Sequence, residues 1–339
     1  QIVMQRNSAY FRAGEGKPYY DRLVFRFVAT DGQSAAEWMA SDCQVIDPAV
    51  GELPNEAQVL YQPASWTLLL FGIQPYDAGR ANPFASQTVR QAAAMCIDRP
   101  AVAQAAGGEL AEAYVPSNSP YYDAQAVLPG YDPEAAGGLL TSAGWVDEDN
   151  DPTTPRTAQG GAATLSVNLY VSPEARLQAA ASLIQQGLAD CGFEVRLETR
   201  PAAESLAAGP DGPVFGRAFD LALFAWQASE TPPCAWMLSS EIPGDYPTYM
   251  KGWSGANAAG YANVEYDRAC SSALTALPGE SSMLADYAQA QRRLAQDLPF
   301  LPLFWQGRTS VASAEVCDLT AADGRLAWWQ IEQARECRD

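Results

Sequence analysis

Residues 84–99 read FASQTVRQAAAMCIDR, and this stretch decides the fold. Small or apolar side chains recur in it at the i, i+3, i+4 and i+7 spacing of one helical face: Val89, Ala92, Ala93 and Cys96. Small residues on that face allow the helix to pack closely against a sheet. Arg90 and the Asp98–Arg99 pair are expected to tie the helix ends to neighbouring loops. The motif therefore predicts a packing role.

On either side of this motif the chain alternates between strands and helices. Strand-like runs lie at 1–6, 22–29, 57–62, 66–74, 163–171, 193–200, 219–226 and 298–313. Helical runs lie at 84–106, 133–145, 174–192, 264–277 and 281–298, and residues 34–47 read as a helix, a turn and a short strand. The alternation predicts an α/β fold.

The order of these runs predicts two lobes. The chain starts β-rich, passes through an α/β body and returns to a β-rich end. We expect residues 1–62 and 305–339 to form part of a first, discontinuous lobe, and residues 63–304 to form a second α/β lobe. The strands near 62–74 and 300–312 are expected to serve as a hinge.

Composition excludes several classes of function. The 40 acidic and 21 basic residues give a net charge of −19, which disfavours nucleic acid as a partner. The chain has no His, so it cannot build a Ser-His-Asp or Cys-His catalytic centre. It also has no nucleophile elbow, phosphate loop or CxxC pair. We expect no enzymatic activity, no cofactor and no metal.

The polar segment 147–161 is the one candidate for a cation site. Asp147, Asp149 and Asp151 alternate as in a calcium loop, but the glycine and distal glutamate of an EF-hand are missing. A solvated hairpin tip is the favoured interpretation.

Eight segments together resemble one known family. They include GKPYYDRLVFRFV (16–28), ASDCQVID (40–47), ASWTLLLFGIQ (64–74), NPFASQTVRQAAAMCIDRPAVAQAAGG (82–108), GYDPEAAGGLLTSAGW (130–145), FDLALFAWQAS (219–229), WSGANAAGYANVEYDRACSSAL (253–274) and QRRLAQDLPFLPLFW (291–305). In this order they resemble extracellular solute-binding proteins family 5, the oligopeptide- and dipeptide-type receptors of ABC transporters. The resemblance covers nearly the whole chain.

The resemblance implies a type II periplasmic-binding-protein-like fold and a receptor function. Such a receptor is extracytoplasmic, binds a peptide or another small polar solute between two lobes, and delivers it to the permease subunits of an importer. We expect a monomer that meets the membrane only through an upstream lipid anchor. Because the chain begins with Gln1 in mid-strand, we also expect a piece that lacks the family's N-terminal part.

The same resemblance points to ligand-binding residues. Trp226 matches a family tryptophan that flanks the peptide, and Ser229 matches the acidic residue that pairs with the peptide's free amine. A serine cannot supply that charge. Either the neighbouring Glu230 supplies it or the ligand is not a free-amine peptide. Further aromatic candidates for the ligand site are Trp66, Trp253, Tyr261 and Trp305.

Cysteine pairing is open from the sequence. The candidate disulfides are Cys234–Cys270 beside the ligand-side loop and Cys317–Cys337 in the C-terminal tail. Cys96 is expected to be a buried free thiol. Cys43 is expected to pair with Cys191 or with a cysteine outside the chain.

Two alternative functions stay open at this point. The first is a ligand-binding sensory domain of a signalling protein, because the family fold serves that purpose too. The second is an oligosaccharide receptor, because Ser229 weakens the peptide interpretation and aromatic faces suit sugars.

Overall fold

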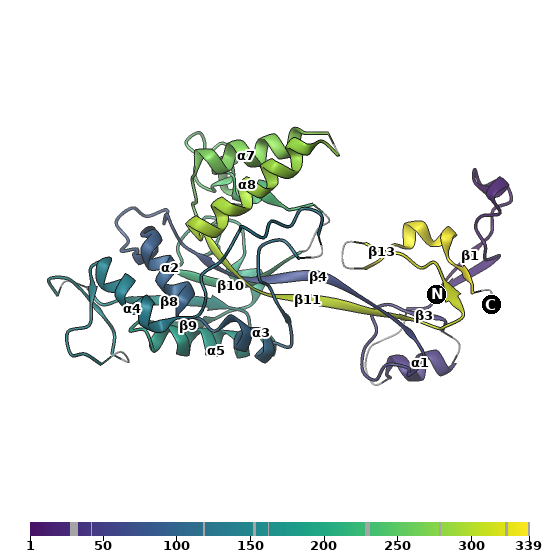
Figure 1. Ribbon diagram of the computed structural model, residues 1–339, viewed down its shortest axis with the longest axis horizontal. Coiled ribbons are helices and arrows are strands. Elements are labelled where there is room, and N and C mark those ends of the chain that lie inside the picture. The colour runs from purple at the N-terminus through teal and green to yellow at the C-terminus, as the bar shows by residue number, and fades with distance from the viewer. Residues whose placement is uncertain are drawn as a thin grey trace. The chain divides into compact units, whose positions relative to one another are not determined.

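The computed structural model describes residues 1–27, 33–41, 43–117, 119–151, 154–161, 163–227, 231–277, 279–322 and 325–337. The chain forms two compact units (Figure 1). Unit 1 comprises Gln1–Ser65, Gln227–Glu230 and Gln306–Asp339, and unit 2 comprises Trp66–Trp226 and Thr231–Trp305. Strands β4 (Gln58–Phe71) and β11 (Phe300–Ala312) each run from one unit into the other.

Unit 2 is built on a sheet with the strand order β11-β4-β10-β8-β9. β8 (Ser166–Val171) is parallel to β9 (Glu194–Thr199), and β10 (Leu221–Gln227) is parallel to β8. β5 (Glu109–Leu110) pairs antiparallel with β11. The apolar runs of β4 and β11 are buried in this unit, as expected for strands covered on both faces.

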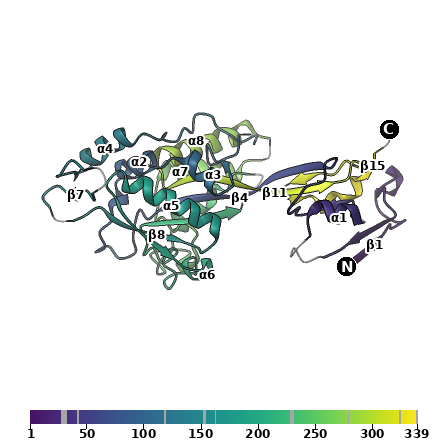
Figure 2. The ribbon, with the colours of Figure 1, turned by 90° about the horizontal axis from the view of Figure 1, so that it is seen from below.

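Helices α2 (Gln87–Met95), α3 (Arg99–Ala105), α4 (Pro133–Ser142) and α5 (Ala175–Ala189) share one hydrophobic core with this sheet. α5 packs against β8 and β9, which its β-α-β connection joins (Figure 2). α7 (Val264–Thr275) and α8 (Ser281–Asp297) pack against each other as a helical hairpin (Figure 1).

The structure confirms the packing role predicted for the motif at residues 84–99. Val89, Ala92, Ala93 and Cys96 are all at most 1% exposed. The buried Arg90 guanidinium donates to four backbone carbonyls, those of Phe84, Ala85, Asp297 and Leu298. Burial lowers its pKa to about 10, so Arg90 stays charged at neutral pH. The motif thus joins α2 to the end of α8.

The prediction of one helix over 84–106 is wrong. The chain forms a short 3-10 turn, η2 (Pro83–Ala85), and then two helices, α2 and α3, with a break between them. The Asp98 carboxylate accepts a hydrogen bond from Ala101 N at 3.1 Å and so begins a new helix. Pro100, at the start of that helix, cannot donate to a preceding turn.

The structure corrects the expectations for Cys96 and Cys191. Cys96 is not a free thiol, because it forms a disulfide with Cys191, which is therefore not the partner of Cys43. The half-buried Cys43 forms no disulfide within this chain. The bridge needs the end of α2 to approach α5 closely. Gly187 permits this approach, because a Cβ at that position would collide with the carbonyl oxygen of Cys96. The Cys234–Cys270 and Cys317–Cys337 disulfides form as proposed from the sequence.

Unit 1 contains short strands and few long elements. β1 (Ile2–Gln5) pairs antiparallel with β2 (Arg22–Phe25), and β3 (Val45–Ile46) pairs with β11. Further elements of this unit are η1 (Ala13–Glu15), α1 (Ala35–Ser41), β12 (Val316–Cys317), β13 (Ala321–Ala322), β14 (Arg325–Leu326), η6 (Trp328–Gln333) and β15 (Arg335–Glu336). Apolar side chains of β1 are half exposed, with Ile2 at 53% and Met4 at 50%.

β6 (Trp145–Val146) and β7 (Thr157–Ala158) pair as an antiparallel hairpin, and Asp147, Asp149 and Asp151 lie in the connection between the two strands. The Asp149 carboxylate accepts hydrogen bonds from Asp151 N and Thr154 Oγ1, and these bonds lower its pKa. Asp149 therefore closes its own loop. The remaining elements of unit 2 are α6 (Ala202–Ser205), η3 (Cys234–Met237), η4 (Ser239–Glu241) and η5 (Gly252–Ser254).

Candidate functional site

The carboxyl end of β10 carries the tryptophan singled out from the sequence. Phe224 and Trp226 lie two residues apart and so share one face of the strand, with ring centroids 6.2 Å apart. Phe224 is 7% exposed, whereas Trp226 is half-buried. One aromatic face of the strand end therefore remains partly open to solvent.

Trp226 stacks on a second tryptophan that the sequence analysis did not select. The rings of Trp226 and Trp236 have centroids 4.7 Å apart and an interplanar angle of 26°. Trp236 lies in η3 and belongs to a buried aromatic cluster. Its ring centroid is 6.3 Å from that of Trp66 and 5.2 Å from that of Phe300. Trp66 in turn contacts Trp305 at 6.1 Å. The cluster is a rigid support behind Trp226.

The predicted candidates Trp66 and Trp305 are in this cluster, but both are buried. Trp66 is 1% exposed and Trp305 is 6% exposed. Their rings pack against each other, and the Trp66 ring also packs against Tyr114 and Phe300. The structure therefore gives them a packing role behind Trp226.

Two polar atoms inside the cluster lack hydrogen-bond partners among the described residues. They are the indole Nε1 of Trp236 and the hydroxyl of Tyr114. The two groups are near each other, and Trp236 lowers the pKa of Tyr114 slightly against the larger upward effect of burial. Their geometry nevertheless falls short of a hydrogen bond.

A cavity of about 140 Å³ opens beside Phe224. Its walls come from the carboxyl ends of the parallel strands β8 and β10, from the start of α5 and from α6. Ligands of α/β proteins commonly bind in this position, outside the carboxyl ends of parallel strands. The hydroxyls of Ser172 and Ser205 are buried in the cavity wall and lack partners among the described residues. Each can donate to or accept from a bound polar group.

Charged groups of both signs surround the cavity. Glu174 and Arg176, both in its wall, form an ion pair at 2.9 Å. The Arg200 guanidinium lies 5.5 Å from the ring centroid of Tyr170, another wall residue, and pairs with Glu198 at 3.5 Å. Paired charges of opposite sign suit a neutral or zwitterionic polar solute better than an ion of one sign.

The other predicted residues lie elsewhere or outside the described residues. Trp253 packs on Tyr76 with centroids 4.8 Å apart, and its Nε1 donates to Asp245 at 2.9 Å. Tyr76 also donates to Asp245, and this bond is the main cause of the lowered pKa of that carboxyl. The buried Tyr261 donates to Asp297 at 2.7 Å. Ser229 and Glu230 are outside the described residues.

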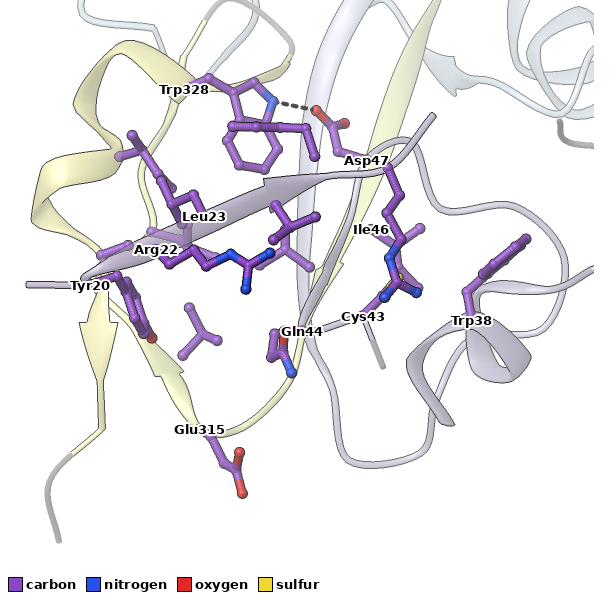
Figure 3. Close-up of a pocket in the computed structure, with 18 of the residues that line it drawn as sticks. Tyr20, Arg22, Leu23, Trp38, Cys43, Gln44, Ile46, Asp47, Glu315 and Trp328 are labelled. Carbon is purple, nitrogen blue, oxygen red and sulfur yellow. Dashed lines mark hydrogen bonds between the residues drawn. The ribbon is translucent and has the colours of Figure 1, made fainter. Parts of the chain in front are cut away.

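Unit 1 has a larger cavity, of about 860 Å³, lined in part by β2, the segment 43–48 and η6 (Figure 3). The carboxylate of Asp47 in its wall is already occupied. It accepts hydrogen bonds from Arg308 at 2.7 Å, Ser310 at 2.8 Å and Trp328 at 3.1 Å. This cavity is broad and Asp47 serves the structure of unit 1, so we place the candidate site at the smaller cavity of unit 2.

The described residues form neither a metal-binding cluster nor a helix suited to span a membrane. No group of three or more His, Cys, Asp or Glu side chains among these residues is arranged to hold a metal ion. Among the helices that the structure describes, none combines the length and the apolar character needed to cross a bilayer.

Comparison with known proteins identifies the class. Residues 1–264 match the model of the bacterial extracellular solute-binding proteins, family 5 (middle region), and the chain belongs to this family. Di/tripeptide-binding protein 2 of Pseudomonas aeruginosa (strain UCBPP-PA14) is 26% identical over an alignment of 346 positions, gaps included, which covers 95% of this chain and 57% of that protein. The chain thus spans little more than half the length of this curated relative.

Solved structures confirm the predicted fold. The oligopeptide-binding protein AppA of Bacillus subtilis, in complex with a nonapeptide, matches with a TM-score of 0.65 and 21% identity over 99% of this chain and 64% of that chain. HbpA2 of Haemophilus parasuis matches with a TM-score of 0.76 and 17% identity over 99% of this chain and 62% of that chain. The chain has the α/β fold of the periplasmic binding proteins.

Sequence reasoning missed Trp236, Ser172 and Ser205. The sequence held a signal for Ser172, because this residue directly follows a strand of a strand–helix–strand pattern. Such strands are parallel, and ligands commonly bind at their carboxyl ends. Ser205 lies in a four-residue helix and Trp236 in a 3-10 turn, neither of which has a periodic pattern. Their place in the site depends on contacts between distant segments.

Proposed function

We propose that this chain belongs to an extracytoplasmic receptor that binds a short peptide, or a related small polar solute, and delivers it to the permease of an ABC importer. The observation that carries the proposal is the half-buried Trp226, stacked on Trp236, at the end of a strand whose Phe224 lines a cavity with two serine hydroxyls that lack partners among the described residues. It occurs in a chain that belongs to a solute-binding family. The proposed action is binding, with no bond made or broken.

The site fits one part of a small ligand. Water takes about 30 Å³ per molecule in the liquid, so a cavity of 140 Å³ has room for one side chain and not for a whole peptide. The face of Trp226 suits an apolar or planar group, and the hydroxyls of Ser172 and Ser205 suit a polar one. The rim ion pairs are compatible with the zwitterionic ends of a peptide.

Release and uptake need a moving part. We assign this role to β4 and β11, which pass from one unit into the other. In the proposed mechanism the predicted lobes, 1–62 with 305–339 and 63–304, close over the solute by bending near 62–74 and 300–312. A monomeric receptor, tethered by a lipid anchor and docking on permease subunits, completes the proposal.

An oligosaccharide is the second candidate ligand. It is favoured by the stacked indoles of Trp226 and Trp236, because sugar rings bind on aromatic faces. The serine at position 229 points the same way, since the matching family position is acidic.

Thermal unfolding of the full-length protein, measured with and without ligand, tests the proposal. We expect di- and tripeptides at about a hundred times their dissociation constant to add about 2.7 kcal/mol to the free energy of unfolding. If Glu230 pairs with the free amine, Glu230→Gln removes most of this gain. Stabilisation by oligosaccharides alone would replace the peptide assignment, and no stabilisation by either class would refute the receptor proposal.

A further inference from the structure

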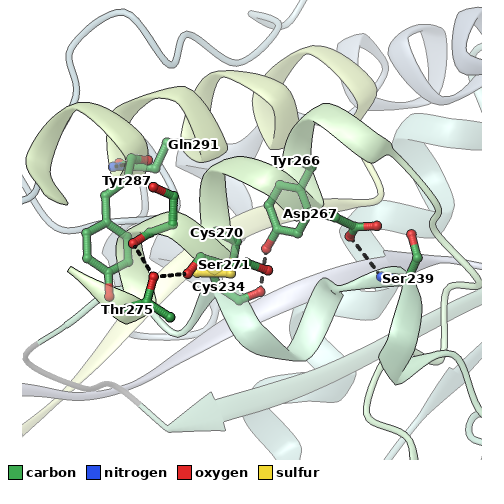
Figure 4. Close-up of a disulfide and its surroundings, with 10 residues drawn as sticks. Cys234, Ser239, Tyr266, Asp267, Cys270, Ser271, Thr275, Tyr287 and Gln291 are labelled. Atoms are coloured by element: carbon green, nitrogen blue, oxygen red, sulfur yellow. Dashed lines mark hydrogen bonds between the residues drawn. A yellow bond between two sulfur atoms is a disulfide. The ribbon is translucent and has the colours of Figure 1, made fainter. Parts of the chain in front are cut away.

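The segment that carries Trp236 is fastened to helix α7 at three points (Figure 4). Cys234, the first residue of η3, forms a disulfide with Cys270 of α7. The Tyr266 hydroxyl donates to the carbonyl oxygen of Cys234 at 2.5 Å, and Asp267 Oδ1 accepts from Ser239 N at 2.9 Å. The three residues of α7 that make these contacts, Tyr266, Asp267 and Cys270, lie within about one turn of the helix.

Two of these contacts, the disulfide and the Tyr266 hydrogen bond, are buried, and the Asp267 hydrogen bond is partly buried. Cys234 is 1% exposed and Cys270 is 0% exposed. Burial raises the pKa of Tyr266 well above its ordinary value, so its hydroxyl keeps the proton that it donates. From the other side, Asn257 Nδ2 donates to the carbonyls of Met237 and Leu238 at 3.1 Å and 3.0 Å.

The segment itself has little structure with which to hold a large ring. η3 is four residues long, and its side-chain caps are missing. Trp236, in the middle of it, must nevertheless keep its face against Trp226. A 3-10 turn of this length does not define a ring orientation by its own hydrogen bonds. The external fastenings therefore supply the order.

We propose that the Cys234–Cys270 disulfide and Tyr266 are positioning elements of the ligand site. They fix Trp236, and Trp236 fixes the indole of Trp226 against which the ligand packs. The ligand part of this inference rests on the proposed function, whereas the ring-positioning part stands on the geometry alone. Ligand affinity thus depends on a covalent bond that does not touch the ligand.

The other two disulfides provide matched controls. Cys96–Cys191 lies in the same unit, but it belongs to the core shared by α2–α5 and the sheet, of which Trp226, Trp236 and Cys234 are not members. Cys317–Cys337 lies in unit 1. The three bridges close loops of 95, 36 and 20 residues, so the positioning bridge lies between its controls in expected stabilisation.

The first experiment needs no ligand. Two stacked indoles couple their electronic transitions and give a pair of bands of opposite sign in circular dichroism. We expect Trp226→Phe to abolish this pair of bands, and their loss in that variant assigns them to the Trp226–Trp236 stack. We expect the Cys234→Ala/Cys270→Ala variant to lose most of this signal and Tyr266→Phe to lose part of it. The Cys96→Ala/Cys191→Ala and Cys317→Ala/Cys337→Ala variants are expected to keep it. All are measured well below their unfolding midpoints.

An unchanged signal in the folded Cys234→Ala/Cys270→Ala variant overturns the proposal. Equal loss of the signal in the control variants also overturns it, because the effect would then follow stability. Tyr266→Phe keeps the ring and removes one hydroxyl, so it tests the same inference in a variant that folds even if the disulfide variant does not.

The second experiment measures the affinity for trialanine by calorimetry. We expect the Cys234→Ala/Cys270→Ala variant to bind about three- to tenfold more weakly than the wild type, and both control variants to bind as the wild type does. If the wild type binds no peptide, the proposed function fails, and the dichroism result still decides the positioning role. If the wild type binds and the disulfide variant binds equally well, the positioning proposal fails alone.

Discussion

The two ends of strand β10 use polar groups in opposite ways. At the amino end, the buried carboxylate of Asp220 accepts hydrogen bonds from Arg80 at 2.6 Å and from Asn168 N at 2.9 Å. At the carboxyl end, the buried hydroxyls of Ser172 and Ser205 lack partners among the described residues, and the half-buried Trp226 follows two residues after Phe224, which lines the same cavity as the serines. Paired groups hold the fold, whereas unpaired groups at low exposure remain available to a ligand.

Removal of the Asp220 carboxylate disrupts the hydrogen bonds at the amino end of β10 and should have the largest effect on the free energy of unfolding. Asp220→Ala leaves the guanidinium of Arg80 without its counter-charge and Asn168 N without an acceptor. We expect a loss of about 3 kcal/mol in the free energy of unfolding, because the substitution removes the buried partner of an ion pair and leaves a half-buried guanidinium and a backbone N–H without their acceptor. Urea denaturation measures it.

Asp220→Asn is the matched control for this prediction. The amide keeps an acceptor for Asn168 N and removes only the charge, so its cost should be smaller than that of the alanine variant. Peptide affinity, extrapolated to the folded fraction, should be the same in both variants. A larger loss of affinity than of stability would contradict the separation between the two ends of β10.

Removal of the Trp226 ring should instead affect the proposed ligand site at the carboxyl end of β10. We expect Trp226→Ala to weaken peptide binding by about 2 kcal/mol, or about thirtyfold, since a tryptophan at the centre of a binding site commonly contributes that much. Stability should change less, because the ring is half-buried. Calorimetric titration with a tripeptide measures the effect.

Trp253→Phe separates the two surface tryptophans of the sequence prediction. It keeps an aromatic ring against Tyr76 and removes the indole N–H that donates to Asp245. We expect it to bind peptide as the wild type does. A loss equal to that of Trp226→Ala would place Trp253 in the ligand site.

Local patterns carried most of what could be predicted about the fold. The helical face of Val89 and Ala92 follows from spacing alone, and Asp132 before Pro133 marks the start of α4 because the cap is a matter of neighbouring residues. The break between α2 and α3 was missed although Asp98 caps α3 in the same way. There the continuous run of small residues outweighed the cap signal.

The site was predictable only where one residue matched a family motif. Trp226 met that condition, whereas Trp236, Ser172 and Ser205 reach the site from three separate segments. The Cys96–Cys191 bridge, 95 residues apart in sequence, was missed for the same reason. Pairings of this kind are set by how the end of α2 approaches α5 at Gly187, which periodicity within either helix does not reveal.

Removal of the Ser205 hydroxyl tests the contrast between paired and unpaired polar groups, with a smaller expected effect on stability than the Asp220 substitution. The Ser205 hydroxyl is buried and has no partner among the described residues, so we expect Ser205→Ala to raise the free energy of unfolding of the ligand-free protein by about 1 kcal/mol. The same variant should bind peptide more weakly. Ser310→Ala is the control, because that buried hydroxyl donates to Asp47 at 2.8 Å, and it should lose about 1 kcal/mol instead. Destabilisation by both substitutions would mean that Ser205 is a structural residue.

The smallest expected effect is a dependence of stability on pH at the amino end of β10. Burial raises the pKa of Asp220 above its ordinary value, against the opposing effects of Asn168 N and Arg80. The folded state then holds the Asp220 proton more tightly than the unfolded state, so the stabilisation from protonation is full at low pH. It is lost as pH rises from the ordinary value of about 3.9 through the raised one. We therefore expect the stability of the wild type, relative to Asp220→Asn, to fall with rising pH across that window in urea titrations. A relative stability that rises instead would show that the attraction of Arg80 outweighs the cost of burying the carboxylate.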